Sequence, residues 1–179
     1  MKKPVSAGQS RRKFIYDIGL TTLSIPAMSL LSRHSISKEE NSLQRIRNEK
    51  AAGKSGIALV GLGNYAGGQL APALLQTEHC YLAGIVTGHP EKAEKWKKKY
   101  AIPDSNIYNY SNFDNIKNNP DIDIIYIVLP NSMHEEYVIR AAAAGKHVIS
   151  EKPLAIATND CDKMIAACKK ANKMFSVGY

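Results

Sequence analysis

Short apolar runs recur over the last two thirds of the chain, and most are followed by a stretch with helical spacing. The runs cover residues 57–60, 81–86, 107–108, 122–129, 147–150 and 175–177. Runs of this length, rich in Ile and Val, are typical of strands buried on both faces of a parallel sheet. Because strand and helix patterns alternate throughout, the sequence predicts an α/β fold with a doubly wound parallel sheet, in which residues 122–129 form a central strand.

Four of the stretches between these runs carry apolar side chains three or four positions apart, as amphipathic helices do. They contain Leu70, Leu74 and Leu75; Ala93, Trp96 and Tyr100; Val138, Ala141 and Ala142; and Cys161, Met164, Ile165 and Cys168, the last group after a cap at Thr158 or Asn159. Pro90 fits a first helical position, and Gly145 fits the C′ position after a helix. Ser132 and Glu135 have the spacing of a capping box. Pro72 fits its helix only within the first turn, where a missing N–H is tolerated.

The first strand leads directly into a glycine-rich turn. Gly61, Gly63 and Ala66 give the pattern G-x-G-x-x-A. In dinucleotide-binding sheets the first glycine permits the tight turn, the second lets the backbone approach a pyrophosphate, and the small third residue allows close helix–strand packing. The N–H groups of the following helix attract the anion. A glycine-rich turn also occurs without a ligand, so the other strand ends must decide between the two interpretations.

The end of the second strand carries no acidic residue, although an NAD-binding sheet usually places one there to bind the adenosine ribose. Val86 is followed by Thr87, and the next acid and cation are Glu91 and Lys92. Thr87 and Lys92 would attract a 2′-phosphate that an acid would repel, so the sequence favours NADP over NAD. The alternative is that both are ordinary turn and surface residues and that either cofactor binds.

The strand at residues 147–150 ends in Glu151-Lys152-Pro153. Proline restricts the residue before it to extended backbone, so the Lys152 amine is expected to point into the crevice at the carboxyl edge of the sheet. There it can donate a hydrogen bond to a substrate hydroxyl and stabilise the alkoxide that forms as hydride leaves. Glu151 would hold this lysine or contact the nicotinamide ribose. These residues predict an oxidoreductase with Lys152 as its catalytic residue.

The first 34 residues hold most of the excess positive charge. They contain six Lys or Arg and one acid, the rest of the chain contains 18 basic and 15 acidic residues, and the net charge is +8. A nucleic-acid-binding surface is therefore not needed to explain the charge. Arg11, Arg12 and Phe14, followed by the mostly apolar residues 15–31, predict a twin-arginine signal over residues 1–34 and a periplasmic location. The alternative is an amphipathic helix; Asp17 and other polar residues argue against a membrane span.

Residues 35–55 are polar, with mixed charge and little apolar periodicity. They predict a linker or arm, with or without one short helix, before a domain over residues 56–179.

Cys80, Cys161 and Cys168 show no C-x-x-C spacing, so we predict three core cysteines and no metal site. An odd cysteine count in an exported protein leaves a reactive thiol as the alternative.

Three sequence blocks resemble the glucose–fructose oxidoreductase, inositol dehydrogenase and rhizopine-catabolism (Gfo/Idh/MocA) family. They are residues 60–66 (VGLGNYA), 129–134 (LPNSMH) and 145–148 (GKHV), the last continuing into 151–153 (EKP). The likeness covers residues 55–179 and is strongest to the glucose–fructose oxidoreductase branch, through residues 108–113 (YNYSNF) and 87–92. That branch is exported by the twin-arginine route with NADP already bound, since the periplasm supplies no nicotinamide cofactor.

The resemblance implies a Rossmann domain that binds NADP, with NAD possible, and a sugar or polyol substrate. The implied cofactor-binding residues are Gly61, Gly63, Asn64 and Tyr65 at the pyrophosphate, Thr87 and Lys92 at the 2′-phosphate, Tyr110 near the adenosine, Leu129, Pro130, Asn131 and His134 at the nicotinamide, and Glu151 beside the catalytic Lys152. Without the resemblance, a histidine in a first helical turn, such as His134, is more often a surface residue.

Members of the family continue into a second α+β domain, which supplies the substrate pocket and a proton-transferring Asp, His or Tyr. The sequence stops at Tyr179, at the hinge between the halves, so the second domain is expected to be missing and a homo-oligomer is expected only for a full-length form. Three functions stay open: the cofactor-binding half of a sugar or polyol oxidoreductase, an NAD-dependent glycosidase of the same superfamily, and a truncated, non-catalytic nucleotide-binding module. The missing acid after the second strand argues mildly against the glycosidase.

Overall fold

The computed structural model describes residues 28–179, with side chains from residue 36 onward. It divides into two compact units, residues 1–37 and residues 38–179, and all described strands belong to the second. Residues 1–27 of the predicted twin-arginine signal lie outside the described residues. The last part of that prediction, residues 28–34, falls within the helix α2 (Met28–Ala51).

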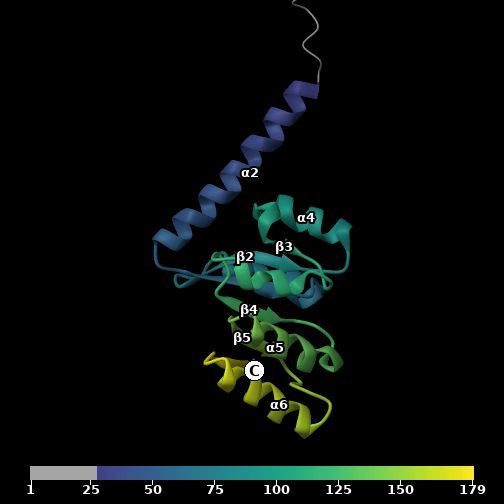
Figure 1. The fold of residues 1–179 in the computed structure, drawn as a ribbon. Coiled ribbons are helices and arrows are strands. Elements are labelled where there is room, and N and C mark those ends of the chain that lie inside the picture. Colours follow the sequence, from purple (N-terminus) through teal and green to yellow (C-terminus); the bar gives the residue numbers. More distant parts are fainter. Residues whose placement is uncertain (1–27) are drawn as a thin grey trace, which may run out of the picture. The chain divides into compact units, whose positions relative to one another are not determined.

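Strands and helices alternate within residues 38–179 as the sequence predicts (Figure 1). The strands are β1 (Ser55–Val60), β2 (Cys80–Val86), β3 (Ile107–Tyr108), β4 (Ile124–Ile127), β5 (His147–Glu151) and β6 (Phe175–Gly178). The helices after β1 are η1 (Ala66–Leu70), α3 (Ala71–Leu74), α4 (Pro90–Tyr100), η2 (Asp104–Asn106), η3 (Phe113–Asn118), η4 (Asn131–Met133), α5 (His134–Ala143) and α6 (Thr158–Lys170). Every predicted strand is present, although β4 is shorter than its apolar run.

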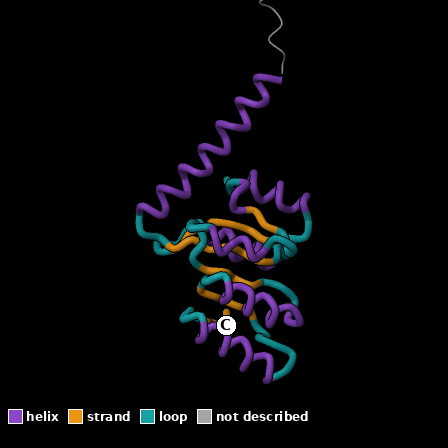
Figure 2. Tube along the Cα trace, viewed as in Figure 1, coloured by secondary structure: helices purple, strands orange, loops and turns teal. Residues whose placement is uncertain are grey.

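The six strands form one sheet in the order β3-β2-β1-β4-β5-β6 (Figure 2). All five neighbouring pairs are parallel, including the central pair of β1 and β4. The chain moves outward from β1 to β3, returns to the centre at β4, and then moves outward in the other direction. This order is that of a dinucleotide-binding sheet, and it confirms the predicted doubly wound fold.

Residues of the central strands β1, β2 and β4 enter two separate cores, one on each face of the sheet. On the first face Leu59 of β1 packs in a cluster with Trp96 of α4. On the second face Val60 packs in a cluster with Val138 of α5 and Met164 of α6, two helices that lie side by side. Because both faces are covered along β1, its buried residues are apolar without alternation, as the sequence indicates.

Pro72 is accommodated by an irregular helix. Residues 66–70 form a π-helix, η1, in which the N–H of Ala71 donates to the carbonyl of Ala66, and α3 begins at Ala71. Pro72 thus lies in the first turn of α3, as predicted. Proline would clash with a carbonyl four residues earlier in a continuous α-helix, and the wider π turn relieves that clash. The sequence pattern gave no sign of the π-helix.

The polar stretch predicted as a linker or arm, with or without one short helix, is helical over most of its length. Residues 38–51 form the second part of α2, and Ile46 is 1% exposed in the second core. The Arg45 guanidinium donates to the carbonyl of Leu82 at 3.1 Å, and the Glu39 carboxylate accepts from the N–H of Asp104 at 2.8 Å. This segment is attached to the domain by one buried apolar residue and a few polar contacts. Its sequence therefore shows little of the apolar periodicity that indicates a helix.

Two predicted helix starts are wrong in detail. Ser132 and Glu135 do not form a capping box, because the turn of η4 precedes α5 and places Met133 at the N-cap. Thr158 is the first residue of α6 and not its cap. Gly145 follows α5 with a φ of +73°, which confirms the predicted C′ position. Helix starts depend on the loop before them, and residue spacing alone does not define that loop.

Candidate functional site

The glycine turn follows β1 at the centre of the carboxyl edge. Gly61 has a φ of +93°, and its N–H donates to the carbonyl of Val86 at 3.0 Å. A Cβ atom on Gly61 would lie 2.5 Å from the carbonyl oxygen of Val128. The backbone conformation and the close approach of the β4 end both exclude a side chain here. Position 61 therefore needs glycine for the turn itself, as the motif predicts.

Gly63 has a different role from Gly61. A Cβ atom on Gly63 would meet nothing within 4 Å, so the fold does not require glycine at this position. Asn64 and Tyr65 follow at the start of the helical stretch, and Tyr65 is 48% exposed. The missing side chain leaves open space beside the N–H groups of this turn, which can approach a phosphate there. The turn thus fits the pyrophosphate of a dinucleotide.

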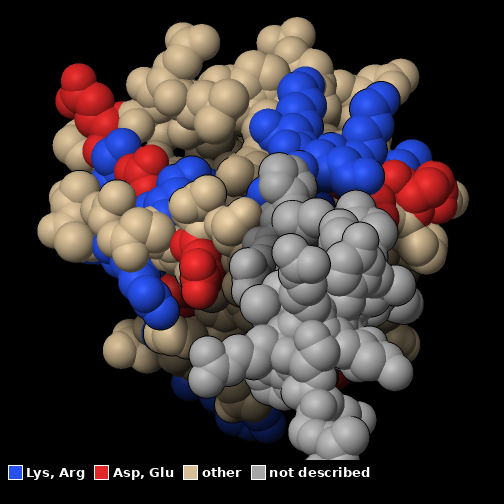
Figure 3. All heavy atoms as spheres, turned by 90° about the horizontal axis from the view of Figure 1, so that it is seen from above, with Lys and Arg blue, Asp and Glu red and all other residues tan. Residues whose placement is uncertain are grey.

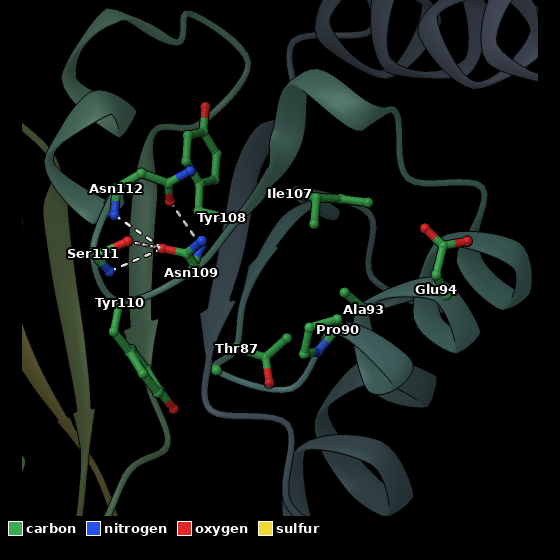
Figure 4. A pocket seen from close by; sticks show the side chains of 11 residues that line it. Thr87, Pro90, Ala93, Glu94, Ile107, Tyr108, Asn109, Tyr110, Ser111 and Asn112 are labelled. Carbon is green, nitrogen blue, oxygen red and sulfur yellow. Dashed lines mark hydrogen bonds between the residues drawn. The ribbon is translucent and has the colours of Figure 1, made fainter.

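A pocket of about 480 Å³ opens at the carboxyl ends of β2 and β3 (Figure 4). It is lined by Thr87, Gly88, Pro90, Ala93 and Glu94 from the segment after β2 and by Ile107, Tyr108, Asn109, Tyr110, Ser111 and Asn112 from β3 and the loop after it. A Cβ atom on Gly88 would lie 3.0 Å from the Tyr110 ring, so the two walls approach closely at that point. The structure therefore brings Thr87 and Tyr110 together, as the adenosine assignment requires.

The third residue assigned to this end of the cofactor, Lys92, does not line the pocket, whereas Glu94 does. Lys92 lies in the first turn of α4 and is partly exposed. Thr87 is buried, and its hydroxyl accepts a hydrogen bond from the N–H of His89 at 3.2 Å. Burial raises the pKa of the Tyr110 hydroxyl, so this hydroxyl is a neutral donor at pH 7.

Asn109, which was not predicted as a site residue, shapes the pocket wall. The side-chain oxygen of Asn109 accepts hydrogen bonds from the N–H groups of Ser111 and Asn112 at 2.9 and 3.0 Å, two of the interactions drawn in Figure 4. The Asn112 side chain in turn accepts from the N–H of Asn109 at 2.8 Å. These reciprocal turns fix the loop that carries Tyr110. The asparagines three positions apart were a usable signal for such a loop.

The loop after β4 carries Leu129, Pro130 and Asn131, the residues assigned to the nicotinamide side. His134, assigned with them, is only 1% exposed. Its Nε2 lies 2.8 Å from the carbonyl oxygen of Leu129, and its Nδ1 lies 3.1 Å from that of Leu154. Each ring nitrogen thus faces a carbonyl oxygen, to which it can donate when it carries a hydrogen. His134 therefore fastens two loops of the carboxyl edge together from inside the domain and does not line an open surface.

Lys152 is exposed just beyond the end of β5, and the Lys152–Pro153 peptide bond is cis. Glu151 is held on both carboxylate oxygens: Oε1 accepts from the Tyr126 hydroxyl at 2.6 Å and Oε2 from the N–H of Lys152 at 3.3 Å. Tyr126 lies on β4 and was not singled out, because a tyrosine within an apolar run has no distinguishing signal. Since parallel strands end at the same edge, Lys152 shares the edge with the glycine turn.

The described residues give no support for two other kinds of site. No group of three or more His, Cys, Asp or Glu among them could hold a metal ion, and none of their helices combines the length and hydropathy of a membrane span. On the face drawn in Figure 3, one group of basic side chains lies at the upper right with acidic side chains at its edge, and basic and acidic side chains are interspersed at the left. Of the three cysteines, Cys168 is buried and Cys80 and Cys161 are partly buried; none forms a disulfide.

Comparison with known proteins identifies the family. Residues 55–179 match the oxidoreductase family with an NAD-binding Rossmann fold that is named after Gfo, Idh and MocA. The chain belongs to this family. The resemblance drawn from the three sequence blocks is thereby confirmed, and the match covers the whole of the described sheet.

Similar proteins include oxidoreductases that are longer than this chain. The crystal structure of aldose-aldose oxidoreductase from Caulobacter crescentus, complexed with glycerol, is 48% identical with a TM-score of 0.70, over 70% of this chain and 38% of that one. The WlbA dehydrogenase from Bordetella pertussis, solved with NADH and UDP-GlcNAcA, is 25% identical with a TM-score of 0.62, over 70% and 37%. An uncharacterized oxidoreductase of Rhizobium meliloti is 33% identical over 109 residues, 61% of this chain and 31% of that protein. The chain thus spans only about a third of the length of these relatives.

Proposed function

We propose that the chain forms the cofactor-binding part of an NADP-dependent oxidoreductase acting on a sugar or polyol. The observation that carries the proposal is the shared carboxyl edge of the glycine turn after β1 and Lys152 after β5. Bound NADP would supply the hydride acceptor. The Lys152 ammonium, exposed at that edge, would donate a hydrogen bond to the substrate hydroxyl and stabilise the negative charge that develops on its oxygen.

The backbone at Gly61 and Gly63 would hold the pyrophosphate, with Asn64 and Tyr65 beside it. Thr87 and Tyr110 would bind the adenosine end, and Lys92 would reach the 2′-phosphate from the first turn of α4. Leu129, Pro130 and Asn131 would line the nicotinamide side, supported by His134, with Glu151 next to Lys152. The preference for NADP rests on the lack of an acid directly after β2. Membership of the family does not by itself distinguish NADP from NAD, since the structure of the WlbA dehydrogenase contains NADH.

The sugar or polyol assignment is supported by two similar structures, an aldose-aldose oxidoreductase with glycerol and a dehydrogenase with UDP-GlcNAcA. The twin-arginine pattern around Arg11 and Arg12 supports export to the periplasm. That route carries folded proteins, so a cofactor bound in the cytoplasm would leave with the protein.

The test is to purify the 179-residue chain from cells, denature it, and analyse the released nucleotides by mass spectrometry. We expect NADP, and we expect none from a Gly61→Val variant, whose side chain would collide with the carbonyl of Val128. Release of NAD alone would overturn the NADP preference. Release of neither nucleotide, together with no binding of added NADPH or NADH, would overturn the proposed function.

A further inference from the structure

Three neighbouring strands contribute to one small constellation beside Lys152. The Tyr126 hydroxyl of β4 donates to the Glu151 carboxylate of β5 at 2.6 Å, a length typical of a hydrogen bond to an ionised oxygen. A Cβ atom on Gly178 of β6 would lie 2.7 Å from the Tyr126 hydroxyl and 2.9 Å from Glu151 Oε1. The absence of a side chain on β6 therefore leaves the room in which this hydrogen bond forms.

The Tyr126 hydroxyl acts as the donor of this pair. Tyr126 is partly buried on β4. Burial, and then the hydrogen bond to Glu151, raise the pKa of the Tyr126 hydroxyl well above its ordinary value. The hydroxyl is therefore protonated at neutral pH and can donate to Glu151.

We propose that Tyr126 is a positioning residue that holds Glu151 ready to accept hydrogen bonds from the ribose hydroxyls on the nicotinamide side of the bound dinucleotide. This inference rests on the proposed function. A carboxylate has about four lone-pair sites, and the Tyr126 hydroxyl and the Lys152 N–H occupy two of them, so acceptors remain for a diol. A free glutamate side chain loses rotamer entropy when it is ordered, and Tyr126 imposes that order before the ligand arrives.

The experiment compares wild type with Tyr126→Phe in the 179-residue chain, with NADPH binding followed by nicotinamide fluorescence. Tyr126→Phe keeps the ring and removes only the donor, and we expect NADPH to bind about threefold to tenfold more weakly. Adenosine 2′,5′-bisphosphate, which has no nicotinamide ribose, should bind equally to both proteins. A general structural defect would weaken both ligands, so this pair of ligands separates positioning from folding.

Tyr81→Phe is the matched control. The Tyr81 hydroxyl donates to the carbonyl of Asp121 at 3.1 Å, at the opposite edge of the sheet. This variant loses a comparable buried hydrogen bond, and we expect it to bind NADPH like wild type. Gly178→Ala is a second disturbance of the constellation, because its Cβ would displace the Tyr126 hydroxyl or Glu151. It should weaken NADPH and leave the bisphosphate unchanged.

The outcomes separate this inference from the proposed function. Wild type that binds NADPH, combined with Tyr126→Phe that binds it equally well, would overturn the positioning role alone. Equal weakening of NADPH and of the bisphosphate by Tyr126→Phe would also overturn it, in favour of a structural role. Wild type that binds neither NADPH nor NADH would overturn the proposed function and, with it, the role of Tyr126.

Discussion

The two edges of the sheet use their polar groups in opposite ways. At the amino edge, where the strands begin, the groups pair with one another. The buried Lys146 ammonium donates to the carbonyls of Asn119 and Ile122, each at 2.8 Å. The Asp123 carboxylate accepts from Lys50 at 2.7 Å and from the N–H of Gly56 at 2.7 Å. These groups are satisfied by protein partners and stabilise the fold.

At the carboxyl edge the chain leaves groups available to a ligand. Gly63 borders open space, Tyr65 is half exposed, and Lys152 is exposed beyond β5. Where protein contacts do form here, as between Tyr126 and Glu151, they orient a group that still has acceptor capacity. One edge of this sheet therefore maintains the structure, and the other is available for binding. Substitutions at the two edges should separate these properties.

Substitutions at Gly61 and Gly63 should have different effects, the first on the free energy of unfolding and the second on NADPH affinity. Gly61→Val places a branched side chain at a positive φ and against the carbonyl of Val128, so we expect the free energy of unfolding to fall by about 3 kcal/mol or more. Gly63→Ala should change it by less than about 0.5 kcal/mol, yet weaken NADPH binding. Urea denaturation and fluorescence titration measure the two effects. Unchanged NADPH affinity in Gly63→Ala would show that the ligand does not approach this turn.

Lys146 should show the reverse pattern at the amino edge. Lys146→Met leaves the carbonyls of Asn119 and Ile122 without their donor, so we expect unfolding to be easier by about 2 to 4 kcal/mol. NADPH affinity, measured below the unfolding transition, should stay within a factor of two. Lys98→Met, at an exposed position of α4, serves as the control with little effect on either. Loss of NADPH affinity in Lys146→Met would contradict the division between the edges.

Lys92 should discriminate between the two cofactors. A lysine near a 2′-phosphate adds a charge-assisted hydrogen bond that NADH cannot use, so Lys92→Ala should weaken NADPH about tenfold and leave NADH unchanged. Lys95→Ala removes an exposed lysine from the same helix and is the matched control. Equal NADPH affinity in Lys92→Ala and wild type would contradict a contact between Lys92 and the 2′-phosphate. Such a result would agree with the position of Lys92 outside the pocket, and other residues would then determine the preference for NADP over NAD.

The smallest effect is a pH dependence at the amino edge. Burial lowers the pKa of the Lys146 ammonium below its ordinary value of about 10.4. Between the lowered pKa and about 10.4 the unfolded chain binds more protons than the folded one, so stability rises with pH in that window. The free energy of unfolding of wild type, relative to Lys146→Met, should therefore increase as the pH approaches about 10. A constant difference between the two proteins across this range would contradict a buried, desolvated Lys146.

The sequence predicted those features that depend on neighbours along the chain. The turn at Gly61, the doubly wound parallel sheet implied by alternating patterns, and the placement of Lys152 at a strand end all follow from local residue types and spacing. Tyr126 was missed because its hydrogen bond to Glu151 forms only when β4 and β5 become neighbours, and because it lies within an apolar run. The length of the helix before β1 was not predicted, because contacts such as that of Arg45 with Leu82 join segments far apart in the sequence.

Local geometry set a second limit on prediction. Ser132 had the spacing of a cap, but the turn of η4 gave the N-cap to Met133. His134 was expected to line the nicotinamide side, yet its ring is buried between two backbone carbonyls, an environment that no spacing of residues encodes. Positions are therefore easier to predict from sequence than the direction in which each side chain points.

The most direct test of the division between the edges is an NMR titration of the ¹⁵N-labelled 179-residue chain with NADPH. We expect amide shift changes in residues 61–65, 87–88, 129, 131 and 151–152, all at the carboxyl edge. Residues 55–56, 105–106, 121–123 and 146–147, at the amino edge, should not move. Shift changes concentrated at the amino edge, or none anywhere at saturating NADPH, would contradict the account.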